Sequence, residues 1–235
     1  MNAAGDVLLV GRPDVAATSE ILLAHVDAAG SGSFLAEQDD VPAPGPWSYE
    51  HLRQSSRPGG GEAAVYASTS NGPEGVFIVR SGTDSTVALE GDPKPGGGTF
   101  DIPVVPRINS RGDVLFESTL DDGREGLFVA VRGKIYLIAI VGDVAPGTGG
   151  GTFDGFGFAE LNTSRQVVFA ADVTGGSASG GVFLAEPPPA GAPAVSPGGL
   201  VVLATFVSFA GARALRASSG RCRGRVDGKN KPRIR

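Results

Sequence analysis

Residues 91–116 read GDPKPGGGTFDIPVVPRINSRGDVLF, and residues 142–169 read GDVAPGTGGGTFDGFGFAELNTSRQVVF. With two inserted residues allowed, both stretches contain a Gly-Asp pair, a turn rich in Pro and Gly, the run Gly-Gly-Thr-Phe-Asp, and an Asn that precedes a β-rich segment. So many matches in the same order indicate an internal repeat, and a repeat has to be recognised before a fold is assigned.

Two further copies are less well preserved. Residues 2–9 read NAAGDVLL and match residues 109–116, NSRGDVLF, almost position for position. The spacing of the aligned Asn residues gives a period near 53, so that another copy is expected near residue 55, with Trp47 in the place of the repeated Phe. Four copies account for residues 1–186. Because the chain begins inside a copy, we expect an upstream part to be missing.

Within the copies, short β-rich runs alternate with turn signals. Each turn of the form Asn-x-x-Gly is explained by backbone chemistry, since Asn can bond nearby amides and Gly can adopt a positive φ. The third copy predicts four strands of five to seven residues and the fourth copy repeats the plan. The predicted strands are 104–108, 113–119, 126–131 and 135–141, and then 166–173 and 182–186.

The fold class that follows is all-β, with β-propeller-like tandem repeats of four-stranded antiparallel sheets. A single such sheet leaves apolar faces bare, so that neighbouring sheets must cover one another. Four sheets are the low end for a closed ring. An open stack, a truncated piece of a larger propeller and a small oligomer therefore remain alternatives, as do a β-solenoid and a β-sandwich.

Charge is distributed unevenly along the 235 residues. Nine of the 20 Lys and Arg lie within residues 213–235 beside one acid, which leaves 11 basic and 24 acidic side chains in residues 1–212, a net of −13. This acidic body argues against nucleic acid as a partner, because phosphate binding needs a basic face. The single Cys222 excludes a disulfide framework within the chain.

The C-terminal part predicts an attachment segment. Residues 187–197 are rich in Pro and form a predicted linker, and residues 198–216 form a predicted hydrophobic membrane anchor or sorting helix that ends at arginines. Residues 217–235 form a basic tail that is expected to be disordered and to stay on the cytoplasmic side. The alternative is that the apolar run is a buried C-terminal strand or helix of the body, residues 1–186.

The motif of the turns resembles that of a group of bacterial surface proteins. Asn109–Phe116, and less fully Asn2–Leu9 and Asn162–Phe169, resemble the choice-of-anchor tandem repeat proteins named for an NxxGxxAF motif. Departures include Leu9 for the aromatic residue and Arg165 for Gly. Residues 194–200 with the apolar run and the arginines are similar to C-terminal sorting signals of the Pro-Thr-Leu-Ser type. The resemblance implies export and anchoring at the bacterial envelope, and it implies no established chemistry.

No residue type occurs in a pattern that predicts catalysis, a metal site or a cofactor. His25 and His51 stand apart from each other and from Cys, which disfavours a zinc site. Gly96–Gly98 lacks the Gly-Lys-Ser/Thr of a phosphate-binding loop. The recurring acids could at most hold calcium weakly, and the recurring aromatic residues are expected to be wedges between sheets rather than a carbohydrate platform. The acids are Asp92, Asp101, Asp143 and Asp154, and the aromatic residues are Trp47, Phe100 and Phe153.

The sequence thus favours a non-enzymatic, exported and envelope-anchored repeat protein that acts as a structural or interaction surface. Its partner would be an unidentified protein or glycan, with the membrane contacted through the C-terminal segment. The alternative from another class is a propeller enzyme, or a lectin-like module that binds a glycan or another ligand with the loops of one face.

Overall fold

The computed structural model describes residues 7–11, 22–26, 29–37, 48–56, 62–70, 72–80, 83–186 and 201–203. Every regular element among these residues is a β-strand, so the expected all-β class is confirmed. The strands form one sheet of three strands and three sheets of four strands, in which every pairing is antiparallel.

The four sheets follow one another along the chain, and each is built from consecutive strands. Sheet I contains β1 (Val7–Gly11), β2 (Leu22–Val26) and β3 (Gly32–Glu37). Sheet II contains β4 (Tyr49–Ser56), β5 (Glu62–Thr69), β6 (Gly75–Arg80) and β7 (Ser85–Leu89). Sheet III contains β8 (Phe100–Ile108), β9 (Val114–Leu120), β10 (Glu125–Val131) and β11 (Lys134–Ile140). Sheet IV contains β12 (Thr152–Leu161), β13 (Val167–Thr174), β14 (Gly180–Glu186) and β15 (Val201–Leu203).

The predicted strands lie where the alternation placed them, with ends that differ by a few residues. The largest difference is in β8, which begins at Phe100 rather than at residue 104. The Gly-Asp turn and the Thr-Phe run on either side of the Gly-rich loop pair with each other, through an isolated bridge between Pro93 and Thr99. This short pairing lets the strand start earlier than its apolar pattern indicates.

The sheets share irregularities as well as strand order. In sheets II, III and IV the first strand loses register with the second strand twice, the first time directly after Tyr49, Phe100 and Phe153 respectively. In sheets I, II and III another register shift occurs at matching positions, the pairs Leu23/Ala24, Val76/Phe77 and Leu127/Phe128. A bulge bends a strand and increases its twist, so sheets with the same bulges have the same curvature and can pack in the same way.

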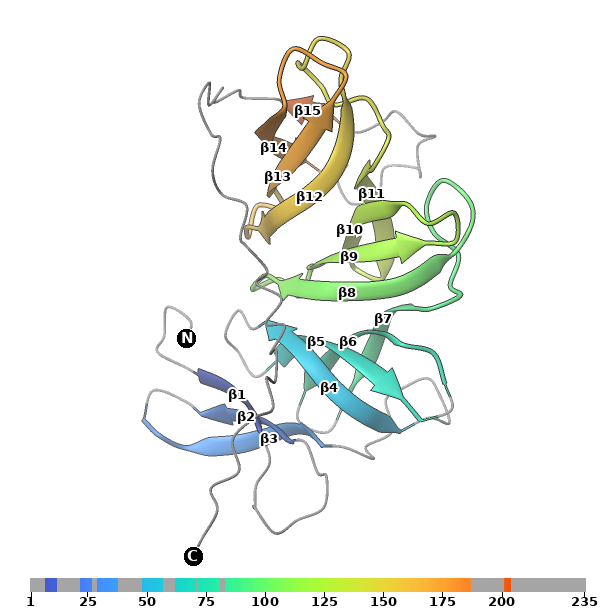
Figure 1. Ribbon diagram of the computed structural model, residues 1–235. Coiled ribbons are helices and arrows are strands. Elements are labelled where there is room, and N and C mark those ends of the chain that lie inside the picture. The colour runs from blue at the N-terminus through green and yellow to red at the C-terminus, as the bar shows by residue number, and fades with distance from the viewer. Residues whose placement is uncertain are drawn as a thin grey trace, which may run out of the picture.

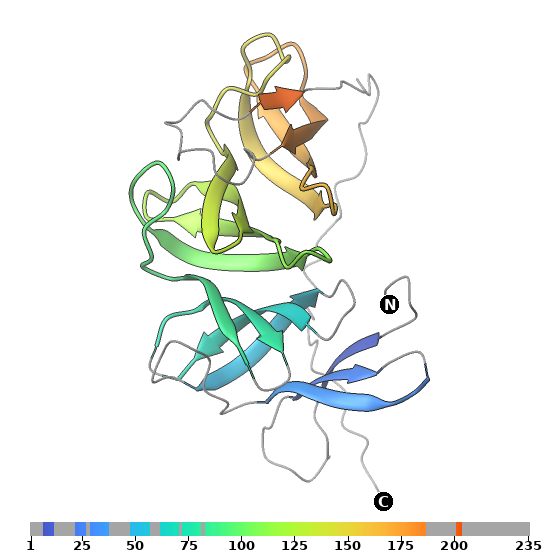
Figure 2. The same cartoon turned by 180° about the vertical axis from the view of Figure 1, so that it is seen from behind.

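The sheets are stacked face to face in an open array, with sheet I at one end and sheet IV at the other (Figures 1 and 2). The described strands do not close into a ring. We call the face of a sheet that points to the next sheet along the chain its forward face, and the opposite face its backward face. Because side chains alternate along a strand, neighbouring residues contribute to different faces.

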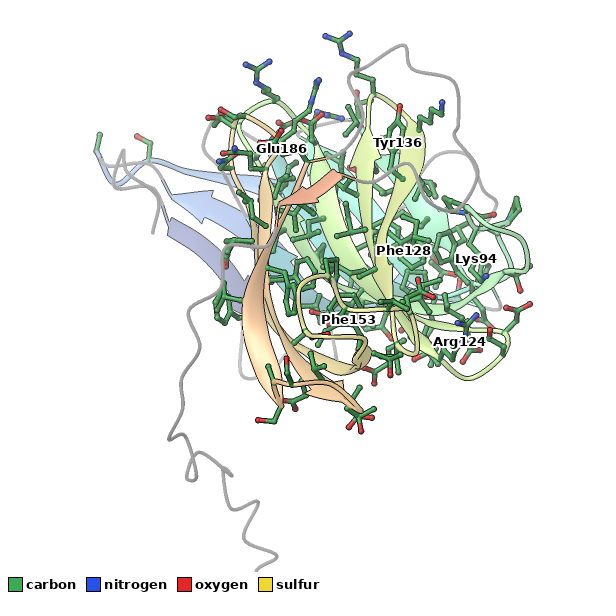
Figure 3. All side chains as sticks on the ribbon, turned by 90° about the horizontal axis from the view of Figure 1, so that it is seen from above. Lys94, Arg124, Phe128, Tyr136, Phe153 and Glu186 are labelled. Atoms are coloured by element: carbon green, nitrogen blue, oxygen red, sulfur yellow. The ribbon has the colours of Figure 1, made fainter. Side chains whose placement is uncertain are left out.

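Each interface in the array combines a backward face rich in aromatic residues with a forward face of aliphatic residues. Between sheets II and III, the rings of Phe100, Phe116 and Phe128 pack with Ala64 and Val76. Between sheets III and IV, three Phe residues pack with aliphatic side chains of β9 and β10. Figure 3, viewed along the stack, shows Phe128 and Phe153 well inside the molecule and Lys94 and Arg124 at its edge. The aromatic residues of the second interface are Phe153, Phe169 and Phe183, and the aliphatic ones include Leu115, Leu127 and Val129.

The aromatic triads have the same geometry in the two sheets. Phe116 and Phe128 are stacked with centroids 5.6 Å apart, and Phe100 meets Phe128 edge to face at 5.0 Å. In sheet IV, Phe169 and Phe183 are stacked at 5.4 Å, and Phe153 meets Phe183 edge to face, again at 5.0 Å. Phe100 and Phe153 are therefore wedges between sheets, as expected.

In sheet II the position of Phe100 and Phe153 is occupied by Tyr49, which precedes the same register shift; Trp47, the residue expected there, lies outside the described residues. Tyr49 is fully buried and meets Phe77 of β6 edge to face, with centroids 5.3 Å apart. The alignment placed the aromatic position two residues too early, because the loop that precedes sheet II has no Gly-Gly-Thr-Phe run to mark it. The Tyr hydroxyl also donates a hydrogen bond to Asp84, 3.0 Å away.

The expected C-terminal helix lies almost entirely outside the described residues. Of residues 198–216, the structure describes only Val201–Leu203, and these form strand β15 rather than helix. Leu203 pairs with Leu184 of β14, so the beginning of the apolar run completes sheet IV. This agrees with the alternative of a C-terminal strand, and the remainder of the segment lies outside the described residues. Among the described residues there is no helix that is long and apolar enough to cross a membrane.

Phe128→Ala should lower the free energy of unfolding by about 3–5 kcal/mol, because it empties the fully buried centre of the interface between sheets II and III. Val144→Ala truncates a side chain that is 67% exposed, and we expect a loss below about 1 kcal/mol. Urea denaturation of both variants measures the difference. Equal losses would contradict the stacked arrangement.

Candidate functional site

The two Asn turns of sheets III and IV adopt one conformation. The Asn109 Oδ1 accepts hydrogen bonds from the amides of Arg111 and Asp113, at 2.9 and 3.1 Å. The Asn162 Oδ1 accepts the equivalent bonds from Ser164 and Gln166, both at 2.9 Å. The fourth residue of each turn has a positive φ, 77° at Gly112 and 68° at Arg165. Arg165 thus takes a conformation that favours glycine, which raises the question of what holds it there.

The two turns contact each other across the interface between sheets. The Asn109 Nδ2 donates to the main-chain oxygen of Asn162, 3.0 Å away and 53 residues later in the chain. The Arg165 Nε forms an ion pair of 3.0 Å with the Asp113 Oδ2. The Asp113 side chain is only 2% exposed and that of Arg165 is 19% exposed, so this pair is largely removed from water. Breaking such a pair leaves an uncompensated charge, which makes the site sensitive to the loss of either partner.

An equivalent contact exists one sheet earlier. A Cβ built on Gly112 would lie 3.6 Å from the Glu62 Oε1 of β5, the residue at the position that Asp113 has in sheet III. Here the fourth residue of the turn is Gly112 and carries no cation, and the Glu62 carboxylate forms an ion pair with Arg80 of β6 at 2.7 Å. The Asn turns and these acids form a polar column along one side of the stack. We call the residues 62, 109–113 and 162–166 the turn column.

The Gly-rich loops lie at the other ends of the first strands and have the geometry of turns. Gly96–Gly98 have φ values of 92°, 93° and 78°, and the Gly97 amide donates to the Lys94 oxygen. The Gly98 α-carbon faces the Asp121 carboxylate so closely that a Cβ there would lie 2.6 Å from its oxygens. These glycines therefore allow a positive φ and close contact with the neighbouring β9–β10 turn.

The recurring acids serve different purposes. The Asp92 Oδ2 accepts a hydrogen bond from the Leu89 amide at 2.9 Å and thereby fixes the turn. Asp143 takes the same place in the next loop, where its main-chain oxygen accepts from the Phe153 amide. Asp101 and Asp154 are exposed on the first strands of sheets III and IV. The part of the chain that the structure describes contains no group of three His, Cys, Asp or Glu residues that could hold a metal ion.

The remaining candidates are not brought together. His25 lies in β2 and His51 in β4, which belong to different sheets. Cys222 is outside the described residues. A further charged group is Glu117 on β9, where burial raises the pKa of the carboxyl, the neighbouring Glu125 raises it further, and Arg107 lowers it. Arg107 also lies 3.5 Å from Glu160 of β12, so these charges connect the rims of sheets III and IV.

The Asp113–Arg165 pair was not predicted from the sequence. In the motif Arg165 stands only as a departure from Gly, and the sequence pattern places Asp113 at the start of the predicted strand 113–119. The available signal was the combination of the two: a cation replaces Gly in one copy, and the preceding copy supplies an acid next to the corresponding position. Stacking of the copies brings these positions together.

Arg165→Met should lower the free energy of unfolding by about 3 kcal/mol, because it leaves the Asp113 carboxylate buried without its cation. The double variant Asp113→Asn/Arg165→Met removes both charges at the same backbone geometry and should recover most of this loss. Urea denaturation of the two single variants and the double variant gives the coupling energy. A double variant no more stable than Arg165→Met would rule out the ion pair as the cause.

Glu117→Gln should stabilise the protein at neutral pH and have little effect near pH 4. Because the pKa of Glu117 is raised on folding, the folded protein binds its proton more tightly than the unfolded chain does. Stability is therefore lost as the pH rises from the usual Glu value of about 4.3 through the raised value, and Gln removes this loss. Thermal melts across this range measure it, with the exposed Asp101→Asn as control. A stabilisation by Glu117→Gln that does not change with pH would contradict this assignment.

Comparisons with known proteins give one family and no relative of known activity. No curated protein matches the chain significantly, and no solved structure does. The profile of a family described as Family of unknown function (DUF7453) matches residues 1–192, which include sheets I to III and the first three strands of sheet IV. The chain therefore belongs to the DUF7453 family of unknown function.

Proposed function

We propose that this protein is a non-enzymatic repeat protein that is exported, held at the bacterial envelope by its C-terminal part, and used as a structural or interaction surface. In this proposal the four sheets are copies of one propeller-like unit with a period near 53 residues. The partner is a protein or glycan outside the chain, and nucleic acid is disfavoured by the acidic body.

The observation that carries the proposal is the agreement between sheets III and IV. Their Asn turns have the same hydrogen bonds, and their Phe triads have the same ring geometry. Agreement at this level supports duplication of one unit. In repeat proteins each unit contacts its neighbours, and the array presents an extended surface whose size grows with the number of units. Such a surface can bind a protein or glycan partner, or can act as a structural spacer.

Support for export and anchoring comes from the sequence. The Pro-rich residues 187–197, the uncharged run that ends at Ala212 and the basic residues from Arg213 onward occur in the order of an attachment segment. The resemblance to choice-of-anchor repeat proteins points the same way. Since Val201–Leu203 pair with β14 in the structure, anchoring would require either that this short pairing opens or that the residues after Leu203 suffice.

Cell fractionation tests this proposal. The full chain should appear in the envelope fraction of the bacterium that makes it, and an antibody against residues 1–186 should label intact cells. Phe206→Lys/Val207→Lys places two charges within the apolar run, which is costly in a membrane, and should release the protein from the envelope. The double variant Ser218→Lys/Ser219→Lys adds the same charges outside the run and serves as control. A full chain found in the cytosolic fraction with its tail intact would exclude the proposal.

A further inference from the structure

The forward face of sheet IV has the composition of an interface, but none of the described strands lies beyond it. Its centre consists of apolar side chains on three strands, and these are only half-buried or exposed. At the equivalent positions of sheet III, Leu115, Leu127 and Val129 are at most 1% exposed, because sheet IV covers them. We call this centre the end face; it consists of Phe158, Val168, Ala170, Val182 and Leu184.

Acidic side chains surround the end face. Two exposed carboxylates lie two residues after apolar residues of the end face, Asp172 after Ala170 and Glu186 after Leu184, and side chains at this spacing point to the same side of a sheet. Asp154 on β12 is exposed as well, whereas Glu160 of β12 is paired with Arg107 of sheet III and does not belong to this margin. Figure 3 shows Glu186 near the rim of the stack. An apolar centre with an acidic margin fits a partner that is apolar in the middle and basic at its end.

We infer that the partner is the C-terminal segment of this same chain, residues 204–216, which folds back over the end face and closes the array. Residues 204–212 read ATFVSFAGA and carry no charge, and Arg213 and Arg216 follow directly. The segment thus has the order of properties that the end face requires: apolar residues for its centre and cations for its acidic margin.

The course of β15 brings this segment to the right place. β15 runs antiparallel to β14 from Val201 beside Glu186 to Leu203 beside Leu184, so residue 204 follows at the edge of the end face. The distance from β15 to β12 is three strand spacings, roughly 14 Å. Nine residues cover roughly 14 Å as a helix and about 30 Å when extended. The apolar run can therefore cross the sheet in either conformation.

Charge disfavours the other occupant that the stacking suggests, the first sheet of a second copy. The body is strongly acidic, with 24 acidic against 11 basic side chains in residues 1–212, and would meet an acidic margin. Residues 213–235 contain nine Lys and Arg and a single acid. Attraction between this segment and the margin works over short distances at physiological salt, where unlike charges reinforce apolar burial.

This placement goes beyond the proposed function and gives the apolar segment a position before attachment. While it covers the end face, the segment is kept from water and the last sheet is protected from association with other chains. Transfer of the segment to a membrane would uncover the end face. The protein in solution and the same protein at the envelope would then differ in whether the end face is exposed, while the stack of sheets stays the same.

Disulfide trapping tests the inference on the full chain with Cys222→Ser as background. Val182→Cys on the end face is combined in turn with Thr205→Cys, Val207→Cys and Ser208→Cys, so that one cysteine faces the sheet whatever the conformation of the segment. Asp122→Cys, exposed on sheet III, replaces Val182→Cys in the control pairs. We expect an intramolecular link in the monomer for at least one end-face pair, with a yield several-fold above its control. Arg213→Glu/Arg216→Glu should lower that yield several-fold, while circular dichroism confirms that the β-structure is kept.

Each other outcome overturns the inference. Links found only in covalent dimers would assign the end face to a second copy. Yields equal to the controls would mean that the segment lies elsewhere, and a link that forms only when anionic vesicles are present would make the membrane surface the partner. Fractionation tests the proposed envelope location, and disulfide trapping tests the position of the C-terminal segment. Either result can therefore be negative while the other proposal stands.

Discussion

The structure depends on the burial of an aromatic backward face by the aliphatic forward face of the preceding sheet. None of the sheets has a core of its own, because a single layer of three or four strands exposes both faces. The fully buried rings of Phe100, Phe116 and Phe128 lie between two sheets and belong to both. Each ring that is buried in such an interface contributes several kcal/mol to the stability of the protein. Sheets that follow one another along the chain are also neighbours in the stack. The turns and loops position the first strand of each sheet so that its aromatic residue lies in the interface with the preceding sheet.

The turn column adds orientation to this packing. Apolar faces tolerate sliding, whereas hydrogen bonds and ion pairs have narrow geometries. The contacts from Asn109 to Asn162 and from Asp113 to Arg165 connect the Asn turns of neighbouring sheets, and they fix how one sheet sits on the next. Arg165 adopts a positive φ, which is strained for a residue with a side chain, and its ion pair with Asp113 holds it there. At the equivalent position of sheet III, Gly112 adopts the same conformation without strain. The preceding interface has Glu62 at the same position but satisfies it within sheet II, so the column varies in chemistry while its position is kept.

How far the sequence could predict this molecule differs between levels. Most strands of sheets III and IV and the wedge role of Phe100 and Phe153 follow from the sequence pattern that residues 91–116 share with residues 142–169. Tyr49 could not be placed, because the stretch before sheet II lacks the Gly-Gly-Thr-Phe run that marks this position before sheets III and IV. The Asp113–Arg165 pair joins residues 52 apart, and only the stacking direction reveals that they meet. The order of the Pro-rich linker, the apolar run and the arginines predicts a membrane anchor or sorting helix for residues 198–216, and the strand at Val201–Leu203 depends on the free edge of β14, which the sequence does not show.

The free edge of β14 and the end face beside it are both surfaces that need to be covered. β14 would otherwise present unpaired main-chain groups, and sheet IV would present apolar side chains; each promotes association with other chains. β15 covers the edge with three residues. The face needs a larger cover, since Val182 and Leu184 stand where sheet III has residues without exposure. A repeat array terminates its stack with a unit or segment whose outer side is polar. The chain after Leu203 starts with an apolar stretch and ends with cations, so a single segment could cover the face on one side and meet water, or an anionic surface, on the other.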